Sequence, residues 1–101
     1  MAEEWLRQGD CLLFRVESVK GNQQQRNSTV LAEGEVTGHK HVLSGQILES
    51  VFEDERFIEV LNKPAILQHE EHNTLEIPEG KYQVLLQREV DLLGEVRQVM
   101  D

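Results

Sequence analysis

All four histidines of the 101-residue chain fall in two short clusters, His39-Lys40-His41 and His69-Glu-Glu-His72. Side chains of a strand alternate between its two faces, so His39 and His41 would point to one side, about 7 Å apart, with Lys40 on the other. Two imidazoles at this spacing can bind one divalent metal as neighbouring ligands. A second pair would complete a tetrahedral set or leave a position open to water or substrate.

His69 and His72 can join the first pair in one site only if the chain between them turns. His69 and His72 are three positions apart, so a regular strand would turn them to opposite faces. They converge only if Glu70 and Glu71 form a turn. With that turn, the sequence predicts a metal site with these four ligands: His39, His41, His69 and His72. Imidazole suits Zn, Fe, Cu and Ni, and an added carboxylate favours Fe or Mn, so the metal remains open among Zn, Fe, Ni and Mn.

Acidic residues stand close to the histidines and could extend the site. Glu70, Glu71 or Glu49 could serve as a further ligand, as a general base, or as the acceptor for an imidazole N–H. If the site is catalytic, a metal-bound water would be the nucleophile or base, and Glu70 or Glu71 would move its proton. Two alternatives stay open. The histidines and glutamates could form a metal-free pocket for a small anion or for acid–base chemistry, or the histidines could be structural or surface groups.

Composition excludes several classes of function. The net charge is −9, the ten basic residues are dispersed, and only five aromatic residues are present, which argues against nucleic acid as a partner. No stretch approaches the roughly 20 apolar residues of a membrane helix. Cys11 has no internal disulfide partner, so we expect a buried thiol in the reducing cytoplasm. The acidity suits solubility, attraction of cations or a basic protein partner.

The elements that must position these residues are predicted to be strands. Apolar and polar residues alternate over short segments with turn residues between them, which indicates an all-β domain spanning residues 1–101. We expect a small barrel or sandwich of about six to eight short antiparallel strands. The segments are 11–17, 29–36, 39–44, 46–52, 56–61, 65–69, 74–77 and 81–90. Gly45 is expected to end a strand, and the polar segment 18–28 is expected to be a mobile loop.

The last eleven residues permit two interpretations. Apolar residues recur at helical spacing in 91–101, which predicts a short amphipathic helix, but the segment could instead be a strand that pairs with another subunit. This feature supports a second hypothesis, that the protein is a non-enzymatic acidic module for protein interaction or self-assembly. A homo-oligomer would then form through strand edges or through residues 91–101.

Two resemblances bear on the site. His39-Lys40-His41 followed by Pro78-Glu79-Gly80 resembles the cupin pattern, in which an H-x-H pair, a glutamate and a later histidine bind one metal inside a β-barrel; it implies a metal site of that type. The chain is also similar to short bacterial proteins of unassigned function. That resemblance rests on the segments 32–41, 69–72, 80–84 and 87–89, and it implies only that they belong to one unit.

Overall fold

The computed structural model describes residues 5–34 and 38–87, and this part of the chain forms eight strands. In chain order they are β1 (Trp5–Gln8), β2 (Cys11–Arg15), β3 (Gln24–Glu33), β4 (Lys40–Phe52), β5 (Glu55–Val60), β6 (Ala65–Gln68), β7 (Leu75–Ile77) and β8 (Gly80–Leu86). Every pairing between them is antiparallel. The expected all-β antiparallel fold is therefore confirmed.

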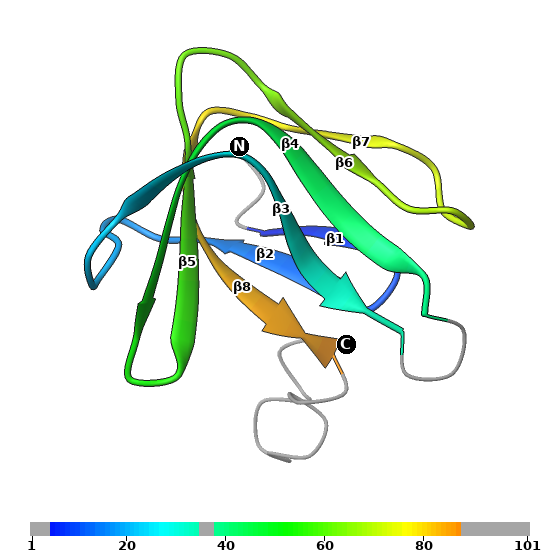
Figure 1. Ribbon diagram of the computed structural model, residues 1–101, viewed down its shortest axis with the longest axis horizontal. Coiled ribbons are helices and arrows are strands. Elements are labelled where there is room, and N and C mark those ends of the chain that lie inside the picture. Colours follow the sequence, from blue (N-terminus) through cyan, green and yellow to red (C-terminus); the bar gives the residue numbers. More distant parts are fainter. Residues whose placement is uncertain (1–4, 35–37, 88–101) are drawn as a thin grey trace.

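The sheet curls into a nearly closed barrel (Figure 1). Its strand order is β1-β2-β8-β5-β4-β6-β7, and β3 pairs with β4 outside this path. The first and last strands of this order come together where Gln8 of β1 meets the β6–β7 hairpin. Its Nε2 donates to the carbonyl oxygens of Leu67 and Asn73, at 2.9 and 2.8 Å. One buried amide thus joins the first strand to the β6–β7 hairpin. No helix in the described residues is long and apolar enough to cross a membrane.

The longest strand, β4, corrects one prediction. Gly45 does not end a strand but lies inside β4, where the strand changes partner. Residues 42–44 pair with β6, and residues 47–52 pair with β5. Gly45 has φ +148°, and a Cβ there would lie 3.1 Å from the Cβ of Ala65. Glycine is therefore required because the backbone of β4 and Ala65 of β6 approach closely at this bend.

The loop expected over residues 18–28 is also shorter than predicted, because its second half, Gln24–Ser28, belongs to β3. Their side chains are exposed, so no apolar alternation marks the strand in the sequence. Two register shifts interrupt the pairing of β3 with β4, one between Arg26 and Ser28 and one between Val30 and Ala32. The second shift buries two consecutive residues, Leu31 and Ala32, in the core.

The core explains why the chain closes on itself. Apolar side chains from β2, β3, β4, β5, β6, β7 and β8 meet in one cluster, and the largest of them with almost no exposure include Tyr82, Leu13, Leu43, Ile47, Ile58, Leu67 and Ile77. Cys11 is fully buried in this cluster, as expected, and burial raises the pKa of its thiol to about 12. The expected C-terminal helix at 91–101 lies outside the described residues.

Candidate metal centre

Three segments that are distant in the sequence meet at one end of the barrel (Figure 1). They are the β1–β2 turn, the start of β4 and the loop after β6. The loop brings His69 back to the first pair: its ring centroid lies 4.2 Å from that of His41 and 5.7 Å from that of His39. His72 follows, 4.6 Å from His69. The bend over residues 70–72 thus brings all four histidines together, with His69 at the centre.

His41 is the buried member of the cluster, with 3% of its side chain exposed. Its Nδ1 lies 2.8 Å from Oε1 of Gln8. Because the amide nitrogen of Gln8 is held by two backbone carbonyls, its oxygen must face His41, and that oxygen can only accept. The proton of the imidazole is therefore on Nδ1, and Nε2 of the neutral ring keeps a lone pair. This is how a neighbouring group orients a histidine for metal binding.

The electrostatics keep His41 neutral. Burial of the ring lowers the pKa of His41 below its ordinary value of 6.5, and the neighbouring His69 and His72 lower it further, against an opposing effect of Asp10. Nε2 of His41 lies 3.6 Å from Oδ1 of Asp10. In the neutral state two lone-pair acceptors face each other, an arrangement that a shared cation or an added proton would stabilise. Asp10 therefore places a carboxylate oxygen beside Nε2 of His41.

A second set of donors lies on the outer side of the cluster. One ligand atom each from His39, His69 and Glu70 lies within 4.8 Å of the others. Donors about 2.0–2.2 Å from one metal lie within roughly 4.4 Å of each other, so small side-chain movements would bring these three into range. The set comes from the start of β4 and from the loop after β6, so a metal here would join the two segments.

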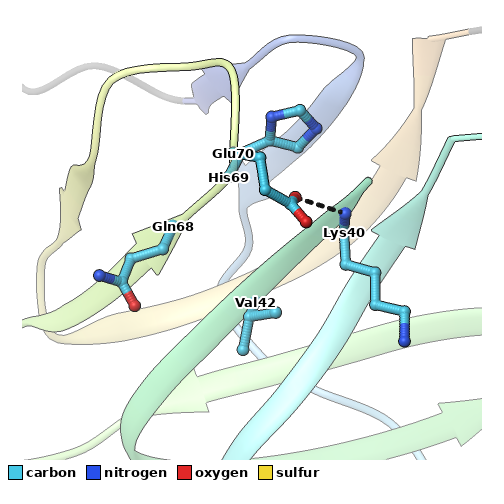
Figure 2. A pocket seen from close by; sticks show the side chains of 5 residues that line it. All are labelled: Lys40, Val42, Gln68, His69 and Glu70. Atoms are coloured by element: carbon cyan, nitrogen blue, oxygen red, sulfur yellow. Dashed lines mark hydrogen bonds between the residues drawn. The ribbon is translucent and has the colours of Figure 1, made fainter. Parts of the chain in front are cut away.

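Glu70 is fixed by the backbone of β4. The backbone N–H of Lys40 donates to Oε1 of Glu70 at 3.1 Å, as Figure 2 shows. This hydrogen bond is the main cause that lowers the pKa of Glu70, and the backbone N–H of Glu70 adds to it. The side chain is therefore a carboxylate at neutral pH, ready to serve as an oxygen ligand.

Glu71 contacts two of the histidines. Its backbone N–H donates to Nδ1 of His69 at 3.0 Å, and its Oε1 lies 3.5 Å from Nδ1 of His39. The first contact places the proton of neutral His69 on Nε2. Metal ligation by His69 therefore requires either that this proton moves or that Nδ1 gives up its bond to the Glu71 amide. The Glu71 side chain is 64% exposed and stands at the rim.

His72 is exposed and covers the β1–β2 turn. A Cβ at Gly9 would lie 2.6 Å from Nε2 of His72 and 3.3 Å from Cε1 of His41, and Gly9 has φ +58°. Only glycine therefore allows this turn to lie against the two rings without strain.

Gln8, Gly9 and Asp10 also lie at the site, and no pattern in the sequence indicates that they adjoin the histidines. The other candidate acid, Glu49, does not join the site. It binds Arg56 instead, with Nε of Arg56 donating to Oε2 of Glu49 at 2.7 Å, and Arg26 lies 3.5 Å from it.

Fold and site together define a small antiparallel β-barrel with a histidine cluster at one end. The chain belongs to the family described as "Domain of unknown function (DUF8820)", whose model matches residues 7–87. The match spans β1 to β8 and includes both histidine clusters. Comparisons with curated proteins and with solved structures gave no match.

Proposed function

We propose that the protein binds one divalent transition metal through His39, His69 and Glu70, with His41 as a fourth donor, and that the metal serves to bind or process a small polar ligand. The observation that carries the proposal is the approach of His39, His69 and Glu70 to within 4.8 Å of one another. His41 supports it, because its ring centroid lies 4.2 Å from that of His69 and its neutral ring keeps a lone pair on Nε2.

The donor chemistry narrows the choice of metal. Imidazoles with one carboxylate suit Zn, Fe(II) and Mn better than the hard ions Ca and Mg, which prefer all-oxygen sites. The resemblance of the His39-Lys40-His41 segment to the cupin pattern supports the same type of site. The single buried cysteine supports placing the protein in the reducing cytoplasm.

A second candidate function is protein interaction or self-assembly. Within the described residues, β3 pairs only with β4, so the other edge of Gln24–Glu33 has no strand partner there. Val30 on this strand is 41% exposed. An open strand edge can pair with another chain. Light scattering tests this candidate: a monomer mass for both the full chain and a chain ending at residue 90 would contradict it.

Metal analysis tests the main proposal. The purified protein is stripped with a chelator, dialysed against Zn, Fe(II), Mn or Ni, and analysed by mass spectrometry for bound metal. We expect one equivalent for at least one of these ions. The variants His39→Ala, His69→Ala and Glu70→Gln should lose it. Glu76→Gln, which changes an exposed carboxylate on β7, is the matched control and should keep it.

A second measurement reports on the site itself. Because Nδ1 of His69 accepts from the Glu71 N–H, metal binding should move the amide resonance of Glu71 in a ¹H–¹⁵N spectrum. Absence of stoichiometric uptake for all four ions, or uptake unchanged in the three ligand variants, would overturn the proposal.

A further inference from the structure

A shallow cavity of about 410 Å³, largely open to solvent, adjoins the proposed metal site. It is lined by Lys40, Val42, Gln68, His69 and Glu70, so it lies where β4 and β6 pair and where the loop after β6 begins. In the view of Figure 2, Gln68 and Lys40 stand on either side of Val42, with His69 and Glu70 above. Small-molecule sites measure about 300–1,000 Å³, so the cavity has room for a small metabolite.

The lining combines three kinds of chemistry. Lys40 is exposed, and no carboxylate in residues 5–34 and 38–87 forms an ion pair with its ammonium group. Val42 is half-buried and offers an apolar surface, and Gln68 is exposed and brings an amide. His69 and Glu70 are shared with the proposed metal site, so the metal would border the same cavity.

We infer that this cavity takes a small organic acid, with its carboxylate on the Lys40 ammonium, its carbon chain over Val42, and a neighbouring oxygen directed to the metal. This inference rests on the proposed function, since the metal supplies one of the three contacts. The volume of the cavity, and Lys40 as the one Lys or Arg among the described residues that line it, favour a short monocarboxylate over a nucleotide or a polyanion.

The charges around the cavity make acid binding depend on the metal. Glu70 is an exposed carboxylate at neutral pH, and its Oε1 accepts a hydrogen bond from the backbone N–H of Lys40. Without a metal, an incoming carboxylate therefore meets one negative and one positive side chain. A divalent cation held by Glu70 makes the sum of these charges positive, and bound ions are often the largest charges in a site. By linkage, the acid must tighten metal binding by the same factor by which the metal tightens acid binding.

Calorimetry with defined probes tests the inference. Zinc-loaded and chelator-treated full-length protein are each titrated with 2-hydroxybutyrate, butyrate and n-butylamine. We expect saturable binding of 2-hydroxybutyrate to the zinc form, at least tenfold weaker binding to the chelator-treated form, weaker binding of butyrate, and none of the amine. The Lys40→Met variant should weaken acid binding about tenfold and keep zinc uptake, because its backbone N–H still binds Glu70.

Lys63→Met is the matched control, since Lys63 is exposed in the connection between β5 and β6 and does not line the cavity. It should bind the acid as the unchanged protein does. Zinc uptake without saturable acid binding would overturn the inference alone, and so would equal acid binding by Lys40→Met. If zinc is not taken up, the same titrations are made with whichever of Fe(II), Mn or Ni is bound, and absence of uptake for all four ions would overturn the proposed function and, with it, the inference.

Discussion

At the scale of single residues, Gln8 links the closure of the barrel to the orientation of His41. Its amide nitrogen donates to two carbonyls across the barrel seam, where β1 meets the β6–β7 hairpin, and its amide oxygen accepts from His41. The side chain thus both closes the barrel and fixes the tautomer of one histidine. Gln8 is a positioning residue, because it acts on the proposed metal only through His41.

Replacing Gln8 by Met should separate these two effects. The variant keeps the approximate volume and removes all three hydrogen bonds. Groups that orient a ligating histidine typically contribute about 10–100-fold to metal affinity, so zinc affinity should fall by that factor in competition with a chromophoric chelator. The free energy of unfolding should fall by about 1–3 kcal/mol, because buried polar groups lose their partners.

The tautomer of His41 would stay the same if Gln8 had a purely structural role, so it distinguishes the two roles. Long-range ¹H–¹⁵N spectra of the imidazoles should show the proton of His41 on Nδ1 in the unchanged protein and a mixture of tautomers in Gln8→Met. Gln46→Met, on the exposed face of β4, is the control and should alter neither the tautomer nor the affinity. An unchanged tautomer in Gln8→Met would contradict the assigned role.

The histidines themselves were predictable from spacing, and their surroundings were not. His39 and His41 both approach His69, as strand alternation predicts, although β4 begins only at Lys40. The approach of His69 depended on a turn that the sequence permitted without requiring. Gln8 and Asp10 reach the site only because the barrel closes, so no local pattern could indicate them.

At the scale of elements, β3 is held by a side chain as well as by its ladder. Arg56 of β5 donates to the carbonyl oxygens of Val30 and Leu31, at 2.7 and 3.1 Å, beside the register shift. Its guanidinium also binds Glu49 of β4. The arginine therefore donates to two backbone carbonyls at the point where the pairing of β3 with β4 is irregular.

Replacing Arg56 by Ala should therefore loosen β3. Breaking a fully buried pair costs about 3–5 kcal/mol. The side chains of Arg56 and Glu49 are 28% and 14% exposed, so we expect a smaller loss in the free energy of unfolding, about 2–3 kcal/mol by urea denaturation. Amide exchange in β3 should accelerate more than exchange in β8.

Arg26→Ala provides the matched control for this prediction. Arg26 approaches the same carboxylate, with Nε 3.5 Å from Oε1 of Glu49, but its side chain is 48% exposed. Its removal should cost less than about 1 kcal/mol, as is usual for surface pairs. Equal losses in the two variants would show that Arg56 contributes no more than a surface charge.

The elements also show which strands a sequence pattern can reveal. β8 has the alternation of a strand with one buried face and was predicted within a few residues, and β5 was predicted within one residue at each end although its consecutive residues Phe57 and Ile58 are both buried. β1 was not predicted as a strand, because four residues are too few to show a period. The first half of β3 was taken for a loop, because its exposed side chains leave no apolar alternation. β4 was divided at Gly45, since a glycine at a bend and a glycine at a strand end look alike in sequence.

At the scale of the whole molecule, the candidate site coincides with the place where the barrel closes. The β1–β2 turn, the start of β4 and the loop after β6 are joined there by side chains of Gln8, His41 and Glu70. A metal bound by the start of β4 and the loop after β6 would add a further link between these segments. The proposed ligand should therefore stabilise the fold as well as occupy the site.

Thermal unfolding measures this coupling. A ligand that binds only the folded state at 100 times its dissociation constant contributes about 2.7 kcal/mol. For a domain of this size, 1 kcal/mol shifts the melting temperature by about 4 °C or more, so saturating zinc should raise it by roughly 10 °C. Addition of a chelator should restore the original value. Magnesium, which prefers oxygen ligands in octahedral geometry, should give little shift at the same concentration.

The His39→Ala variant locates the effect. It removes one proposed ligand whose side chain is 29% exposed, so the melting temperature without metal should change little while the zinc-induced rise should largely disappear. A full zinc-induced rise in this variant would place the metal elsewhere on the acidic surface. A rise with zinc that is lost in His39→Ala, and retained in the exposed-carboxylate variant Glu76→Gln, would tie the stability of the barrel to the histidine cluster at its seam.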